Sequence, residues 1–215
     1  MEPRYTLGRR QFLRIIGAGS VAGMAAFALN RQSAPARASV TETRVLMGTL
    51  VNLTLVTTDR QAGERAVKAC LDHMAGLEAV MSRHQSSSQL SRLNRQGYLD
   101  NPDANLVHVL RESQRLSALT DGAFDVTVRP LIDLYQDSHN RDGSLPSSRA
   151  LESALARVGY QHLNIDPQRL SFARPGMAVT LDGIAKGYIV DEGAAVLRQH
   201  GFDNILVEAG GDLAS

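Results

Sequence analysis

Residues 177–215, MAVTLDGIAKGYIVDEGAAVLRQHGFDNILVEAGGDLAS, decide the fold of this chain. Their pattern predicts a strand at 177–181, a glycine-rich turn, a helix that ends at Gly201 and a second strand at 204–207. A strand-to-helix turn of this kind presents backbone N–H groups at the start of the helix, where the helix dipole favours a bound anion such as phosphate. Lys186 lies near that start and would add a positive charge.

This glycine-rich turn has two interpretations. Small residues around Lys186 are expected if the backbone approaches a phosphate or pyrophosphate, but glycines in such a turn also allow tight packing in proteins that bind no ligand. The pattern G-x-x-x-x-G-K-[ST] is absent, which excludes a P-loop. The segment alone therefore leaves both a phosphate site and a purely structural turn open.

The rest of the chain predicts strands and helices in mixed order, without an internal repeat. The predicted elements are, in order, a strand or hairpin arm at 45–57, a helix at 59–82 capped by Asp59, a polar loop or short helix at 86–94, a helix from 101–103 to Leu119, a surface loop at 137–148, a short helix capped by Ser148 and ended by Gly159, and two hairpin arms at 163–165 and 170–172. We expect an α+β fold in which helices pack over a mixed or antiparallel sheet.

Composition and charge indicate a globular protein that does not act on nucleic acid. The chain has 215 residues, of which 43% are hydrophobic and 21% charged. Its formal net charge is +1, but residues 1–38 contain six arginines and one glutamate, so 17 basic and 21 acidic residues remain in the rest. A net charge of −4 with scattered basic residues argues against nucleic acid as a partner.

The N-terminal residues resemble an export signal. Arg9 and Arg10 form a twin-arginine pattern, an uncharged run of about 15 residues follows, and small residues at Ala36 and Ala38 predict cleavage before Ser39. We therefore expect a twin-arginine signal peptide at 1–38, export to the periplasm and no stable membrane anchor. The alternative is a transmembrane helix, for which the run is short, because spanning requires about 20 residues.

Cys70 is the only cysteine, so no disulfide within the chain is possible. It falls on the apolar face of the helix predicted at 59–82, where we expect a buried structural thiol rather than a nucleophile. The histidines show no shared spacing that would build a metal site.

Four motifs together point to a known family. They are Met47-Gly48-Thr49, the segment MSRH at 81–84 with SQLSRLN at 88–94, the segment TDGAFDVTVRPL at 120–131, and LDGIAKGYIVD at 181–191 with Gly210-Gly211-Asp212. In order and approximate spacing they resemble the ApbE family of FAD:protein FMN transferases, within which the NosX-like subset is one candidate. The resemblance implies a T-fold-like α+β domain at 39–215 that transfers FMN from FAD to a Thr or Ser hydroxyl of an acceptor protein, releases AMP and uses Mg²⁺.

The resemblance also implies site residues. Met47 matches a methionine that packs on the flavin nucleotide, and His84 stands where the family usually has an aromatic residue that stacks on FAD. Lys186 matches a lysine that contacts FAD, and Gly183 occupies the position whose backbone carbonyl is a metal ligand. An imidazole can stack, but it buries less area than a larger ring.

A second group of residues is implied at the adenosine side. Ala123, Phe124 and Asp125 match the segment that lines it, although Asp125 can equally serve as a structural cap. Thr180 departs from the family pattern, since many relatives have Asp there, and Asp182 would reach the same face if the strand continues. No residue is identified as catalytic. The role of Asp212 has two interpretations, either a carboxylate that only stabilises the turn or a residue of the site.

Two functional hypotheses follow. The first is a periplasmic flavin transferase that matures an acceptor flavoprotein of an electron-transfer system, for example in nitrous-oxide reductase maturation. The second is a non-catalytic FAD-binding or flavin-delivery protein, which the departures at His84 and Thr180 keep open. Family members run about 100 residues further and carry their remaining Mg²⁺ ligands there. The sequence therefore predicts a C-terminally truncated domain that binds FAD weakly, transfers nothing and exposes the strand at 204–207 as a sheet edge.

Overall fold

A four-stranded antiparallel sheet forms the base of the fold in the computed structural model, which describes residues 37–215. Its strands occur in the order β1-β2-β6-β7 and comprise Ala38–Leu46, Thr49–Thr57, Ile205–Ala209 and Asp212–Ala214. Alternate residues of β2 point inward, so that Val51, Leu53 and Leu55 are fully buried. The sheet thus joins the N-terminal hairpin to the last strands of the chain.

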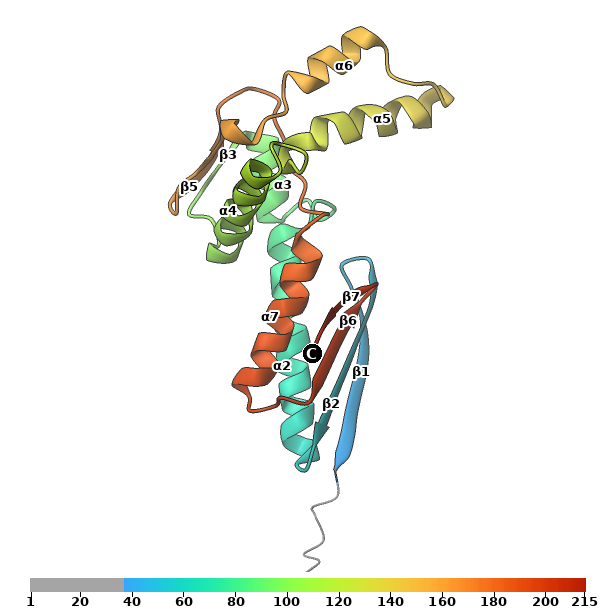
Figure 1. Cartoon of the computed structure of the whole chain (residues 1–215), viewed down its shortest axis with the longest axis vertical. Coiled ribbons are helices and arrows are strands. Elements are labelled where there is room, and N and C mark those ends of the chain that lie inside the picture. Colours follow the sequence, from blue (N-terminus) through green and yellow to red (C-terminus); the bar gives the residue numbers. More distant parts are fainter. Residues whose placement is uncertain (1–36) are drawn as a thin grey trace, which may run out of the picture. The chain divides into compact units, whose positions relative to one another are not determined.

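Two long helices cover the inner face of this sheet (Figure 1). They are α2, Arg60–Met81, and α7, Ala185–Gln199. The α2 helix begins at Asp59, whose carboxylate accepts a hydrogen bond from the Ala62 N–H at 3.0 Å. The two helices pack closely because Gly193 of α7 lies against Met74 and Cys70 of α2. This contact sets the spacing between the helices.

The middle of the chain forms a smaller sheet with its own helices. The strands pair in the antiparallel order β3-β5-β4, and two longer helices, α4 and α5, accompany the short helices of this part. The bounds are α3 Gln89–Gln96, β3 Tyr98–Asp100, α4 Ala104–Leu119, η1 Val126–Val128, α5 Arg129–Asp142, α6 Ser148–Leu155, η2 Tyr160–His162, β4 Leu163–Ile165 and β5 Arg169–Phe172. Leu99, Leu163 and Leu170 fill the space between this sheet and its helices.

The predicted fold class and most predicted elements are confirmed. The helices expected at 59–82 and from Asp103 to Leu119 both form, and Asp59 and Asp103 cap them. The hairpin arms at 163–165 and 170–172 pair as β4 and β5. The segment at 45–57 contains a whole hairpin turn, because β1 ends at Leu46 and β2 begins at Thr49.

The prediction of a strand at 177–181 is wrong, because the described residues between β5 and α7 form no strand. Val179 is fully buried, but its N–H and C=O both bond to the Asn94 side chain, at 2.7 and 2.8 Å. The Thr180 N–H donates to the carbonyl of Val126 at 2.8 Å. The apolar residues are buried as expected, but the backbone finds its partners in a side chain and a turn instead of a neighbouring strand.

Three further predictions are corrected. Residues 137–142 belong to α5 instead of a loop. All of them except the buried Ser138 lie on the exposed face of this helix, whose C-cap is Gly143. Ser147, one residue before the predicted Ser148, caps α6 through the Ala150 N–H. The strand at 205–207 is not an edge, since β6 pairs with β2 on one side and with β7 on the other.

The twin-arginine signal, its cleavage site and the transmembrane alternative fall almost entirely on residues 1–36, which lie outside the described residues. The described chain starts just before β1, whose first residue is Ala38. Among the described helices, none has the length and apolar character needed to cross a bilayer.

Gly193 provides a test of the α2–α7 contact. A Cβ atom at this position would lie 2.8 Å from Sδ of Met74 and 3.2 Å from Sγ of Cys70. Gly193→Ala is therefore expected to lower the free energy of unfolding by about 1–3 kcal/mol through overpacking. Gly76→Ala is the control, because nothing lies within 4 Å of its Cβ position in α2, and it should raise stability by about 0.5–1 kcal/mol. Urea denaturation of both variants measures the difference; equal effects would contradict the close contact.

Cys70 provides a test of burial. Its side chain is fully buried, as predicted, and burial raises the pKa of the thiol to about 12. At pH 8 the native thiol should react with a maleimide more than about a hundredfold slower than the urea-unfolded chain, whose thiol has a pKa near 8.5. Because the unfolded thiol loses its proton first, stability should also fall as the pH rises above about 9. Rapid labelling of the native protein would show that the helix interface opens readily.

Candidate functional site

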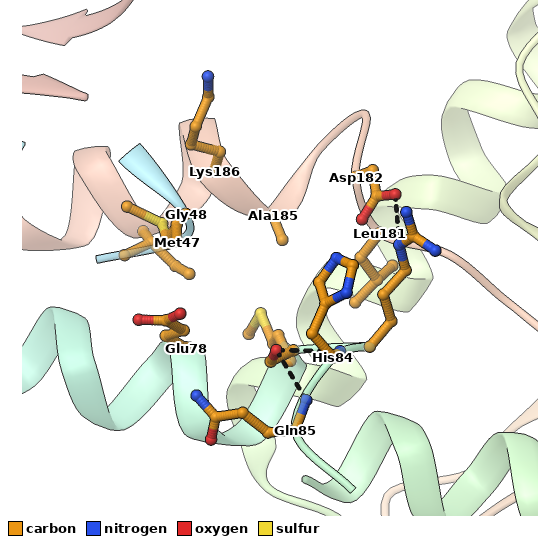
Figure 2. Close-up of a pocket in the computed structure, with 13 residues that line it drawn as sticks. Met47, Gly48, Glu78, His84, Gln85, Leu181, Asp182, Ala185 and Lys186 are labelled. Atoms are coloured by element: carbon orange, nitrogen blue, oxygen red, sulfur yellow. Dashed lines mark hydrogen bonds and ion pairs between the residues drawn. The ribbon is translucent and has the colours of Figure 1, made fainter. Parts of the chain in front are cut away.

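A cavity of about 510 Å³ lies where three segments distant in the sequence meet. These are the β1–β2 turn, the loop after α2 and the first turn of α7 (Figure 2). The lining residues are Met47, Gly48, Glu78, Met81, Ser82, Arg83, His84, Gln85, Leu181, Asp182, Ala185, Lys186 and Ile189. Three of the four motifs found in the sequence thus contribute to one cavity.

The β1–β2 turn places Met47 at this cavity. Leu46 and Thr49 are paired across a two-residue turn in which Met47 and Gly48 have φ angles of 53° and 71°. A pair of positive φ angles suits the twist of a hairpin, but asparagine or glycine usually occupies the first position. A left-handed conformation costs a methionine about 1–2 kcal/mol. This position therefore holds a long apolar side chain although the backbone would favour another residue.

Ser82 organises the loop that follows α2. Its side-chain oxygen accepts hydrogen bonds from the N–H groups of His84 at 3.2 Å and Gln85 at 3.3 Å, drawn as dashed lines in Figure 2. Its carbonyl accepts a hydrogen bond from the Ser91 hydroxyl at 3.2 Å, which ties the loop to α3. The sequence SRHQ at 82–85 thus ends helix α2 and holds four polar side chains at the cavity wall.

The glycine-rich turn before α7 is closely packed. The N–H groups of Ile184 and Ala185 both donate to the carbonyl of Leu181, at 3.0 and 2.8 Å. A Cβ atom at Gly183 would lie 3.4 Å from the ring of Phe124, so the turn rests against this ring. The contact explains structurally why a small residue is suited to position 183. It also connects the third motif, at 120–131, to the fourth.

Lys186 is directed at the turn between β6 and β7. Its ammonium lies 2.9 Å from the Asp212 carboxylate and donates to the carbonyl of Gly210 at 3.2 Å. Both charged side chains are between one third and one half exposed, and such ion pairs contribute about 1 kcal/mol or less. An anionic ligand can compete for this lysine at little energetic cost. Figure 2 shows Lys186 pointing away from His84.

The structure brings some of the predicted site residues together and places others elsewhere. Met47, His84 and Lys186 line the cavity, whereas the remaining predicted residues do not, namely Ala123, Phe124, Asp125, Thr180 and Gly183. Phe124 and Gly183 contact each other directly behind the turn. Thr180 is 7% exposed, and its hydroxyl accepts a hydrogen bond from the Asp182 N–H at 3.3 Å.

Asp125 is fully engaged in local structure. One carboxylate oxygen accepts hydrogen bonds from the N–H and hydroxyl of Thr127, at 2.8 and 2.7 Å, and the other accepts one from the Tyr160 N–H at 2.9 Å. These contacts cap η1 and attach η2 to it. They are the structural role that the sequence left open for this residue, and its contact with adenosine stays a prediction.

The sequence interpretation missed Glu78, Arg83 and Gln85. Arg83 pairs with Asp182 across the cavity wall, with 2.7 Å between Nε and Oδ2. The sequence suggests Asp182 only as a substitute for the aspartate absent at position 180. Position 83 lies beside His84 in the motif at 81–84, so this motif is the signal from which Arg83 could be identified as a site residue. Glu78 faces the cavity because it lies one turn of α2 before Met81 and Ser82.

No cluster of His, Cys, Asp and Glu side chains marks a metal site within the described residues. Within 37–215, no three or more His, Cys, Asp or Glu side chains are grouped so that they could hold an ion. Of the carboxylates near the cavity, Asp182 and Asp212 are engaged by Arg83 and Lys186. Magnesium prefers about six oxygen ligands, and the carbonyl of Gly183 would supply one.

Comparison with known proteins agrees with this geometry. The model of the ApbE family matches residues 47–215, a segment that contains all four motifs and every residue of the cavity wall. The chain belongs to the ApbE family. The resemblance on the four motifs is thereby confirmed.

Curated relatives of this ApbE-family chain carry one description. A protein from Vibrio cholerae named FAD:protein FMN transferase is 35% identical over 174 residues, which are 78% of this chain and 51% of that protein. A protein of the same name from Escherichia coli K12 is 28% identical over 84% of this chain and 55% of its own length. The chain thus spans about half the length of the curated relatives it matches.

Solved structures of ApbE proteins share the fold. The flavin transferase ApbE from Vibrio cholerae superposes with a TM-score of 0.71 at 31% identity, covering 83% of this chain and 59% of that one. The apo form of the flavinyl transferase ApbE from Pseudomonas stutzeri gives a TM-score of 0.74 at 28% identity, covering 82% and 57%. The α+β architecture described above is therefore that of the ApbE family.

Proposed function

We propose that this protein is an FAD:protein FMN transferase and that the cavity between the β1–β2 turn, the loop after α2 and the start of α7 receives part of FAD. The observation that carries the proposal is the convergence of three family motifs on one cavity, in a chain whose curated relatives are named for this activity. A cavity of about 510 Å³ is within the usual range for small-molecule sites.

The reaction is a phosphoryl-type transfer. The hydroxyl of an acceptor Thr or Ser loses its proton to solvent as its oxygen forms a bond to the phosphorus on the FMN side. The pyrophosphate P–O bond breaks, and AMP leaves with the bridging oxygen. Such a reaction requires positioning and positive charge more than covalent chemistry from the protein. Met47 and His84 would pack against the nucleotide, and Lys186 would exchange Asp212 for the pyrophosphate.

Magnesium is part of the proposal, with the Gly183 carbonyl as one ligand. Because one carbonyl does not satisfy octahedral oxygen coordination, phosphate oxygens of the ligand and water would supply further ligands. We also propose that the protein acts in the periplasm after twin-arginine export, on an acceptor flavoprotein of an electron-transfer system.

Lys186 offers a sharp test, because it and Lys68 are the only two lysines of the chain. The full-length protein is incubated with FAD, Mg²⁺ and a candidate acceptor, and AMP and acceptor-bound flavin are quantified. Lys186→Ala should lower transfer by about tenfold or more, since one charge-assisted contact to phosphate is lost. Lys68→Ala, in an exposed i,i+4 pair with Asp72, should leave it unchanged. EDTA should abolish transfer. Binding of intact FAD without AMP release would instead support the alternative of a flavin-binding or flavin-delivery protein.

His84 tests the stacking role. If its ring packs on FAD, His84→Tyr should tighten FAD binding by about two- to tenfold through the larger aromatic surface, and His84→Ala should weaken it by a similar factor. His139→Ala, at an exposed position of α5, is the matched control. Isothermal titration calorimetry measures the affinities. Unchanged binding in both His84 variants would exclude stacking at this position.

A further inference from the structure

Arg83 is held at the cavity wall in an unusual way. Its side chain is only 19% exposed, and its Nε lies 2.7 Å from the Asp182 carboxylate. The Nε atom is fully buried, yet its N–H is not aligned with any acceptor, so that the contact is an ion pair without a well-formed hydrogen bond. A buried guanidinium normally satisfies its donors, because leaving one unpaired is unfavourable.

The outer nitrogens of Arg83 are also available. Among residues 37–215, no acceptor is hydrogen-bonded to either Nη atom, whereas the ammonium of Lys186 is occupied by Asp212 and Gly210. Asp182 contacts the Nε edge and is 54% exposed, so water screens its charge more than that of Arg83. Figure 2 shows Asp182, the partner of Arg83, on the part of the wall away from Lys186.

We propose that Arg83 is a phosphate-binding residue of the cavity, positioned by Asp182, and that it makes the site specific for phosphorylated flavins. The inference rests on the proposed function for the identity of the ligand. A planar guanidinium presents a fork of N–H donors that matches two oxygens of a phosphate, and the Asp182 contact leaves its two Nη groups for this purpose. The carboxylate limits the orientations of the long side chain, so less freedom is lost when the ligand binds.

This assignment adds a second cation to the one predicted from the sequence. Lys186 approaches the cavity from α7, whereas Arg83 approaches it from the loop after α2. The two cations lie next to different carboxylates, so that neither ion pair has to break for the other to bind a phosphate oxygen. Riboflavin lacks phosphate, so Arg83 does not raise the affinity of the cavity for riboflavin.

The test compares ligands that differ in phosphate. Affinities of the full-length protein for FAD, riboflavin and inorganic pyrophosphate are measured by calorimetry in Arg83→Gln, Arg83→Lys and the control Arg115→Gln, which removes an exposed arginine that pairs with Glu112. Arg83→Gln should weaken FAD and pyrophosphate binding by about tenfold or more and change riboflavin binding less than about twofold. Arg83→Lys keeps the charge without the fork and should fall between the wild type and Arg83→Gln.

The possible outcomes are distinct. Equal losses for FAD and riboflavin in Arg83→Gln would overturn the inference, because Arg83 would then only shape the loop. An effect no larger than that of Arg115→Gln would overturn it as well. If the wild type binds no FAD, the proposed function itself fails, and a loss of pyrophosphate binding confined to Arg83→Gln would still support a phosphate site. Thermal melts of each variant identify any that fail to fold.

Discussion

The packing of α2 against α7 is the constraint on which the cavity depends. The two helices approach closely at Gly193, where the absence of a side chain leaves room for Met74 and Cys70. Both helices also rest on the inner face of the sheet, α2 on β1 and β2 and α7 on β6 and β7. As a result, the end of α2 and the start of α7 both lie next to the β1–β2 turn, and the three segments line one cavity. Cavity residues from positions 47, 84 and 186 meet because these helices are rigidly spaced.

Electrostatics at the cavity follow a consistent pattern. Each cation on the wall is accompanied by a carboxylate from another segment, Arg83 by Asp182 and Lys186 by Asp212. Partly exposed pairs of this kind contribute little to stability, but they hold long, flexible side chains near the positions where a phosphate would need them. They also keep two positive charges from facing each other uncompensated when the cavity contains only water. Two cations that are held only by partly exposed carboxylates can turn to a ligand that brings its own negative charge.

Local patterns in the sequence anticipate much of the fold. Periodicity and local residue types identify α2 with its N-cap and the start of α4 within three residues. Asp59 and Asp103 satisfy helix N–H groups through contacts only two or three residues away. Sequence patterns fail to predict structure where the hydrogen-bond partners of a segment are distant in the sequence. The segment at 177–181 looks like a strand, but its hydrogen bonds go to Asn94 and Val126. Residues 137–142 resemble a loop in sequence because their polar composition indicates exposure to solvent. An exposed helix face has the same composition, so composition alone does not distinguish the two.

The residues of the candidate site show the same difference between local motifs and contacts that form only in the folded chain. Met47, His84 and Lys186 are recognisable from motifs in the chain alone, since each stands in a short stretch of defined residue types. Arg83 and Asp182 are separated by almost a hundred positions in the sequence, and nothing in either segment announces that they form an ion pair 2.7 Å long. Asp125 shows the converse, because its motif points to a ligand whereas the folded chain surrounds it with three hydrogen bonds from Thr127 and Tyr160. Residue types and short spacings thus reveal the family, its fold class and the helices. Which charged groups face each other is decided by packing, because electrostatic pairing depends on distances of a few ångströms between segments that meet only in the folded state.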